Sequence, residues 1–392
     1  MDSTADGVSA TFEDAVVLYR YEMCHNLTAE AAINVPLCTN STEFPEDYNN
    51  TDDEILQVER IVSLAVPILF GIIVVVGLLG NLLVVIVVMA NQQMRSTTNL
   101  LIINLALADL LFIVFCVPFT AVDYMLPYWP FGDVWCKMVQ YLIVVTAYAS
   151  VYTLVLMSLD RFLAVVHPIA SIYVRTERNA SSAIIVTWVL IVLLALPVLA
   201  RHGEVTYTFS STEHTACIFL DMDPKTRPDG YNKPAYQIFF FLTSYAIPLA
   251  IICILYVLML MRLWKGVNPG GQPPSAESRR GKKRVTRMVV VVVAIFAFCW
   301  FPIQVILVLK SINYYEITAI SVVVQIVSHC LAYTNSCLNP ILYAFLSENF
   351  RKAFRKVIIP WRPEVNAPGR FANGDARSMA VTRTTRTNND IL

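Results

Sequence analysis

Long runs of hydrophobic residues alternate with short polar segments along most of the chain. The first run, Ile61–Ala90, contains no charged residue. Six further runs follow it: Asn99–Thr120, Met138–Leu159, Ala183–Ala200, Tyr236–Met261, Met288–Leu309 and Ile317–Leu346. An α-helix needs about 20 apolar residues to cross a bilayer, and the runs lack the in–out alternation of barrel strands. The pattern predicts an all-α membrane protein, a seven-transmembrane helix bundle over residues 60–346.

Composition and charge support the membrane assignment and orient the chain. Hydrophobic residues make up 56% and charged residues only 15%, too few for a soluble domain of 392 residues. Basic residues concentrate after the fifth and seventh runs, and cytoplasmic loops carry such an excess. These residues are Arg262, Lys265, Arg279, Arg280, Lys282, Lys283, Arg284, Arg287, Arg351, Lys352, Arg355 and Lys356. We therefore expect a multi-pass protein of the plasma membrane with an extracellular N-terminus.

The segments outside the bundle have distinct characters. Residues 1–59 are acidic and carry three glycosylation sequons, at Asn26, Asn40 and Asn49, which predicts a glycosylated extracellular tail. Residues 347–359 alternate apolar and basic positions at helical spacing, which predicts an amphipathic helix on the inner membrane surface. Residues 360–392 are polar and are expected to form a disordered cytoplasmic tail.

Nine cysteines are present, and five of them fall inside apolar runs. The other four, Cys24, Cys38, Cys136 and Cys217, lie in or beside segments predicted to be extracellular. Because disulfides form in that environment, two bridges are possible. The residues alone leave their pairing open.

A few polar residues lie within the apolar runs, where they are costly and therefore candidates for function. Asp109 is the only acid deep in any run, and five other polar residues could surround it: Asn81, Ser150, Asn335, Ser336 and Asn339. Such oxygen ligands suit a hard cation such as sodium, with Asp109 and Ser150 as its ligands. The alternative is a hydrogen-bond network between helices without an ion. No other cofactor is expected.

Several motifs could form a conformational switch. Asp160-Arg161 ends the third run, either as a snorkelling pair or as an ion pair that a partner opens. Trp300 precedes Pro302 in the sixth run, and Asn339 and Tyr343 flank Pro340 in the seventh. Proline interrupts a helix, and it can serve as a hinge or simply as a fixed kink.

Together, these motifs resemble those of rhodopsin-like (class A) G-protein-coupled receptors, one motif on each of the seven runs. The resemblance implies a Cys136–Cys217 disulfide and a sodium pocket formed by Asp109, Ser150, Asn335 and Ser336. It also implies that Arg161, Tyr343 and Trp300 move on activation, and that the chain is a receptor without enzymatic activity. Phe162 departs from the family pattern, which has tyrosine there.

Two ligand classes are disfavoured by single residues. A monoamine receptor needs a carboxylate where this chain has Ile143, and an opsin needs a lysine where it has Tyr333. The segment Glu204–Phe209 alternates polar with apolar or aromatic residues, which predicts a hairpin lid that ends at Cys217. Such a lid is typical of a peptide receptor, although it also permits a small apolar ligand. A transporter with Asp109 as carrier is disfavoured because no internal repeat is evident.

The segments Tyr152–Pro168 and Phe301–Lys310 are similar to those of arthropod allatostatin-A receptors, relatives of vertebrate galanin receptors. This finer resemblance implies a short amidated neuropeptide as ligand, with a galanin-like or other peptide as the alternative. It implies inhibitory Gi/o proteins and arrestin as partners, besides the lipid membrane; no nucleic-acid partner is expected. Candidate ligand-binding residues are Tyr124, Gln140, Gln304, Gln325 and His329.

Overall fold

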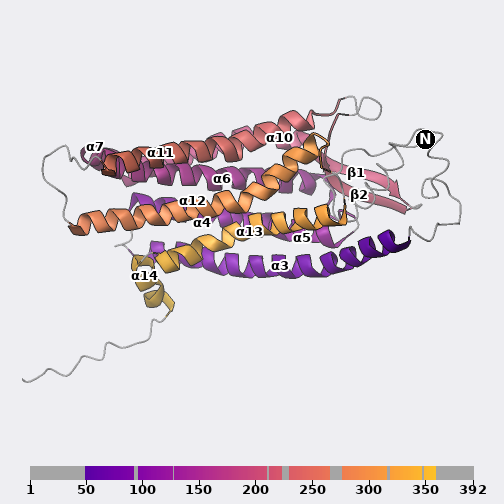
Figure 1. Ribbon diagram of the computed structural model, residues 1–392, viewed down its shortest axis with the longest axis horizontal. Helices are drawn as coiled ribbons and strands as arrows, with labels where there is room; N and C mark the ends of the chain where they lie inside the picture. Colours follow the sequence, from indigo (N-terminus) through magenta and orange to yellow (C-terminus); the bar gives the residue numbers. More distant parts are fainter. Residues whose placement is uncertain are drawn as a thin grey trace, which may run out of the picture.

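The computed structural model describes residues 49–91, 96–126, 128–209, 212–222, 229–264, 276–315, 318–346 and 348–358. Its long helices lie side by side in one bundle (Figure 1). Their bounds are α3 Asn49–Ala90, α4 Thr97–Phe115, α5 Val117–Met125, α6 Gly132–Val166, α8 Glu177–Ala195, α9 Val198–Arg201, α10 Lys233–Phe241, the π-helical turn η2 Leu242–Ala246, α11 Ile247–Trp264, α12 Ala276–Ser311 and α13 Ala319–Leu346. The helical bundle confirms the predicted fold class.

Within the described residues, six spans are long and apolar enough to cross a membrane: α3, α4 with α5, α6, α8 with α9, α10 with α11, and α12. The seventh helix, α13, has 28 residues and packs against α12 and α3. It is more polar because it carries Gln325, His329 and the polar residues around Pro340. Large apolar side chains such as Leu79, Ile185 and Phe298 are exposed on the outside of the bundle, as lipid contact requires.

The two ends of the bundle are different (Figure 1). At one end, β1 (His202–Phe209) and β2 (Thr212–Phe219) form an antiparallel hairpin in which Glu204 lies opposite Cys217. At the other end lie α7 (Pro168–Val174) and α14 (Glu348–Ile358). We refer to these as the hairpin end and the α14 end. The predicted hairpin is confirmed.

The predicted amphipathic helix also agrees with α14. Phe350, Ala353 and Phe354 are buried against the bundle, and Arg351, Lys352 and Arg355 are exposed. The apolar face thus anchors α14, and the basic face is exposed, as suits a helix on a membrane surface.

Two helix bounds differ from those of the hydrophobic runs. The first helix, α3, begins at Asn49, before the first run, and the membrane-length span within it, Leu64–Ala90, lies inside that run. The second span is two helices, because Pro118 has no N–H to bond the carbonyl of Val114. Asn26, Asn40 and residues 360–392 lie outside the described residues, and the side chain of Asn49 is not described.

Candidate functional site

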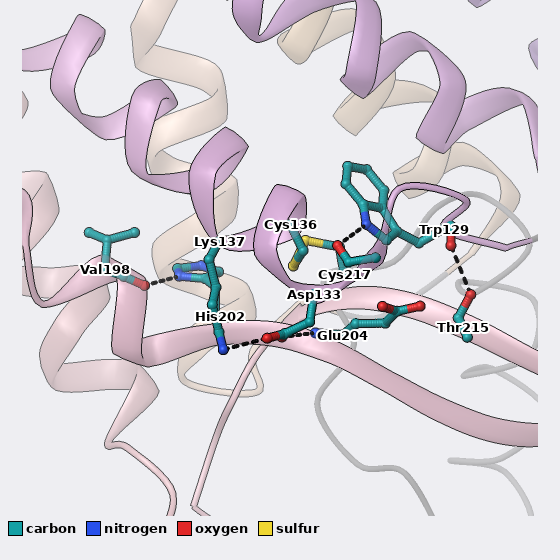
Figure 2. Close-up of a disulfide and its surroundings, with 10 residues drawn as sticks. Trp129, Asp133, Cys136, Lys137, Val198, His202, Glu204, Thr215 and Cys217 are labelled. Atoms are coloured by element: carbon teal, nitrogen blue, oxygen red, sulfur yellow. Dashed lines mark hydrogen bonds and ion pairs between the residues drawn. A yellow bond between two sulfur atoms is a disulfide. The ribbon is translucent and has the colours of Figure 1, made fainter.

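The hairpin is joined to α6 by the disulfide between Cys136 and Cys217, whose Cα atoms are 5.5 Å apart (Figure 2). The predicted pairing is therefore confirmed. Cys136 lies in the second turn of α6, and Cys217 lies in β2. The bridge holds the hairpin over one end of the bundle.

Hydrogen bonds that the sequence analysis missed add to this attachment (Figure 2). The Glu204 backbone N–H donates to Asp133 Oδ1 at 3.0 Å, and Asp133 is also paired with Lys137, one helical turn further along α6. Trp129 and Thr215 form two further bonds, from the Trp129 N–H to the Thr215 carbonyl and from Thr215 Oγ1 to the Trp129 carbonyl. The hairpin is thus fixed to α6 and to the loop before it at several points.

His202, at the start of β1, is buried at the base of the hairpin. Its ring contacts Phe219 and Tyr236, with ring centroids 5.3 and 6.2 Å apart, and its Nδ1 donates to the Val198 carbonyl at 3.2 Å. Burial lowers the pKa of His202 to about 4, and the nearby cations Arg201 and Lys233 act in the same direction. This imidazole is therefore neutral at physiological pH.

Two of the five candidate ligand residues lie in contact. The rings of Tyr124 on α5 and His329 on α13 have centroids 6.2 Å apart. Tyr124 also contacts the ring of Phe70, and His329 also contacts the ring of Tyr333. This aromatic cluster belongs to an apolar core that also includes Ile218 of β2. It therefore lies in the half of the bundle that the hairpin covers.

The three glutamines are placed separately. Gln304 on α12 is only 2% exposed; its Nε2 donates to Ser244 Oγ at 3.3 Å, and its Oε1 has no hydrogen-bond partner. Gln325 accepts from Lys310 Nζ at 3.3 Å, and Gln140 is half-buried on α6. Gln304 thus offers a buried acceptor oxygen, whereas Gln325 is already engaged.

The polar residues predicted to surround Asp109 do form a buried layer. Asn339 Nδ2 donates to Asp109 Oδ2 at 2.9 Å, and the hydroxyls of Ser150 and Ser336 lie close enough to the carboxylate to interact with it. Asn81 Nδ2 donates to the carbonyls of Gly77 and Ser336, both at 2.9 Å. Asp109 Oδ1 and Asn81 Oδ1 have no partner, so the layer contains two buried acceptors that suit a cation. Asn335 is also buried.

Asp160 and Arg161, at the α14 end of α6, form the predicted ion pair, with Arg161 Nε donating to Asp160 Oδ2 at 3.0 Å. The same carboxylate accepts from Thr97 and Thr98 of α4, both at 2.9 Å. Arg175, which the sequence analysis missed, donates from Nε at 2.7 Å and from Nη2 at 3.1 Å. Asp160 is therefore shared by two arginines.

The two proline motifs lie inside continuous helices. Pro302 lies in α12, and the indole of Trp300 packs against Phe296 with ring centroids 6.0 Å apart. Pro340 in α13 packs against Gly80, where an added Cβ would come within 3.1 Å of the proline ring.

Tyr343, one turn after Pro340, is fully buried. Its ring stacks on Phe350 of α14 with a centroid separation of 5.5 Å, and its hydroxyl has no hydrogen-bond partner. This tyrosine therefore joins the end of α13 to the surface helix.

Comparison with known proteins decides the family. Residues 80–343 match the family model described as 7 transmembrane receptor (rhodopsin family). The chain belongs to this family. It is therefore a multi-pass membrane receptor that couples to G proteins, and it is not an enzyme.

Individual receptors are similar over most of the chain. The allatostatin-A receptor of Bombyx mori is 58% identical over 369 residues, which cover 94% of this chain and 96% of that receptor. The galanin-like G-protein coupled receptor npr-9 of Caenorhabditis elegans is 38% identical over 368 residues, or 88% and 85% of the two chains. Human galanin receptor type 2 is 38% identical over 295 residues, or 75% and 73%.

Proposed function

We propose that this receptor binds an allatostatin-A-type neuropeptide, a short peptide with an amidated C-terminus. The observation that carries the proposal is the 58% identity to the Bombyx mori receptor over nearly the whole of both chains. A galanin-like peptide is the second candidate, because galanin receptors match at 38% identity. A small apolar ligand is less well supported, because no relative named above points to one.

The hairpin half of the bundle has suitable chemistry for such a peptide. The rings of Tyr124 and His329 offer apolar surface, and Gln304 Oε1 is a buried acceptor without a partner. A C-terminal carboxamide carries N–H donors, whereas a carboxylate would bring a negative charge and no donor. Gln304 would therefore favour the amidated form.

The membrane orientation follows from the charges, and the partners follow from analogy with related receptors. The basic residues around α14 favour a cytoplasmic α14 end. The hairpin end and the N-terminal tail with its glycosylation sequons would then lie outside the cell, with the receptor in the plasma membrane. The α14 end would bind a heterotrimeric G protein, of the Gi/o class by analogy with galanin receptors. Phosphorylation of the tail would recruit arrestin.

The buried polar groups would serve as the switch. Asp160, Arg161, Trp300, Pro302, Asn339, Pro340 and Tyr343 would change partners when the ligand binds. A sodium ion held by Asp109 and Ser150 would favour the resting arrangement, since two acceptor oxygens in that layer have no partner.

A panel of peptides tests the ligand. Cells that display the receptor at their surface are given amidated allatostatin-A-type peptides, their free-acid forms, galanin and unrelated amidated peptides, and dissociation of each G-protein class is recorded. We expect the amidated allatostatin-A-type peptide to act at the lowest concentration, through Gi/o. Gln304→Leu should weaken it about tenfold or more, because a buried hydrogen bond is lost.

The outcomes separate the alternatives. The same Gln304→Leu variant should respond alike to the amidated and free-acid forms, because the group that distinguishes them is gone. Higher potency of galanin would favour the second candidate. Silence with all amidated peptides at saturating concentration, on receptor verified at the surface, would contradict the peptide proposal.

A further inference from the structure

The π-helical turn η2 bonds to helices on both sides of it. Thr243 is bonded to two tyrosines of α6, and the next two residues, Ser244 and Tyr245, are bonded to α12. Single π-helical turns inside α-helices are rare and often occur at functional positions. This one connects α6, which contacts many neighbours in the bundle, to a helix that is interrupted by proline.

The bonds to α6 follow from the backbone of the π turn. The N–H of Ile247 bonds to the carbonyl of Leu242, five residues back, and Pro248 has no N–H. The carbonyl of Thr243 therefore lacks both of its possible donors within the helix. Tyr152 supplies the missing donor, with its hydroxyl 3.1 Å from the Thr243 carbonyl oxygen. Tyr148 adds a bond of 2.7 Å to Thr243 Oγ1, which fixes η2 on this side.

The main bond to α12 is made at the weak point of that helix. The Tyr245 hydroxyl donates to the carbonyl of Ala297 at 2.8 Å. The next carbonyl along α12, that of Phe298, has no N–H donor at Pro302, and the proline ring crowds it. The Ala297 carbonyl therefore lies directly beside the point where the helix is interrupted. Tyr245 is 8% exposed, and its ring lies beside Phe301 with a centroid distance of 6.4 Å, so the hydroxyl is held in place.

We propose that the Tyr245 hydroxyl is a latch that holds the kink of α12 in the resting arrangement. The helix runs the length of the bundle, so a change of angle at Pro302 moves its α14 end. In this structure Arg161 is still paired with Asp160, and the latch is closed. A change of kink must break the bond to Ala297. Tyr245 is thus a positioning residue that makes the active arrangement costlier.

The latch also lies next to the proposed ligand contact. Ser244, the neighbour of Tyr245 in the π turn, bonds to Gln304, half a turn beyond Pro302. A ligand that bonds to Gln304 Oε1 and turns the amide away from Ser244 removes this second bond between η2 and α12. The bond from Tyr245 to Ala297 is then left to restrain the kink alone. The latch itself requires only that the receptor activates G proteins, whatever the ligand is.

Removal of the hydroxyl alone tests the latch. Tyr245→Phe keeps the ring and its packing, and it should raise G-protein activation in the absence of ligand about two- to tenfold per surface receptor, the range expected for one hydrogen bond. The matched control is Tyr141→Phe, because the Tyr141 hydroxyl also donates to a backbone carbonyl, that of Val192, but joins α6 to α8. The control should match the wild type. Unchanged activity of Tyr245→Phe, or an equal rise in both variants, would overturn the proposal.

A measurement without G protein or ligand gives an independent answer. Spin labels are placed at the exposed positions Arg287 on α12 and Lys352 on α14, with the exposed Cys253 replaced by serine. In purified receptor, Tyr245→Phe should increase the population with a changed distance, and Tyr141→Phe should not. Equal distance distributions in all three proteins would overturn the latch even if the peptide proposal held. A shifted distribution would support it even if no tested peptide were active.

Discussion

The Asp160 carboxylate accepts hydrogen bonds from four side chains: Thr97, Thr98, Arg161 and Arg175. Two cations therefore share one anion. When Arg161 leaves, Arg175 and the two threonines still satisfy Asp160. A buried carboxylate that loses its only cation is strongly destabilised, whereas one with a second cation is not. Arg175 thus lowers the cost of releasing Arg161.

This leads to a prediction for Arg175→Gln. With Arg161 as the only cation beside Asp160, its release becomes costlier, so ligand-independent signalling and agonist potency should both fall, by about tenfold at most because Arg175 is partly exposed. G-protein activation per surface receptor measures both quantities. Arg178→Gln is the matched control, because it removes the same charge from an exposed position nearby. A rise in basal signalling would show that Arg175 restrains the receptor instead.

The partnership of Arg175 could not be predicted from the sequence. In a segment expected to be cytoplasmic, an arginine is already explained by the excess of basic residues there. Its bond to Asp160 depends on how the turn after α7 folds back to α6, which local sequence does not determine. In contrast, Asp160-Arg161 was recognised because the two residues are adjacent and end a hydrophobic run.

Among the elements, the hairpin is attached most specifically. The disulfide, the Asp133 bond and the Trp129–Thr215 pair fix it to α6 and to the preceding loop, and His202 fixes its base to α9 and α10. The His202 ring is neutral and enclosed, with Arg201 and Lys233 as the charged groups that act on it. Protonation would place a third positive charge in this cluster.

His202 should therefore make the receptor sensitive to acid. Its pKa is about 4 in the folded receptor, whereas an unperturbed histidine has a pKa of 6.5, so the unfolded chain binds the proton first. The contribution of neutral His202 to the free energy of unfolding is fully present above pH 6.5. It is lost as the pH decreases towards 4, and the loss is about 2 kcal/mol at pH 5. Thermal unfolding of purified receptor at pH 7.5 and pH 5 measures this loss. His202→Gln should reduce it, whereas His214→Gln, on the neighbouring strand, should not.

Periodicity predicted some elements well and others poorly. Alternating residues indicated the hairpin, and the spacing of Phe350 and Phe354 indicated α14. The break between α4 and α5 was missed, although Pro118 marks it. The π turn could not be predicted, because Pro248 accounts for one missing N–H but the hydroxyl that replaces it comes from Tyr152 on another helix. Elements that depend on a partner helix are the ones that local patterns do not determine.

For the whole molecule, the hydrophobic pattern was sufficient for the bundle, because each helix satisfies its own backbone and turns apolar side chains to lipid. The more polar α13 shows what the pattern leaves open. Its residues Asn335, Ser336 and Asn339 are buried, and Asn339 bonds to Asp109 on α4. The sequence predicted that these residues would lie near Asp109. It could not predict which oxygens would remain without partners.

The oxygens without partners, Asp109 Oδ1 and Asn81 Oδ1, lead to a prediction about the balance between the resting and the active arrangement of the bundle. A cation that binds only the resting bundle stabilises it by about 1.4 kcal/mol at ten times its dissociation constant. Sodium should therefore lower agonist affinity and raise the unfolding temperature, relative to choline at equal ionic strength. Asp109→Asn should abolish both effects, because the carboxylate charge is lost.

The serine on α6 provides the sharper comparison. Ser150→Ala removes a hydroxyl that interacts with Asp109 and should weaken the sodium effects. Thr146→Val removes a hydroxyl one turn earlier, which is bonded to carbonyls of its own helix, and should leave them unchanged. If Asp109→Asn kept the full sodium dependence, the layer would be a hydrogen-bond network alone. In that case Asp109 would hold α4 to α13 through Asn339, and the two arrangements would differ in that bond rather than in a bound ion.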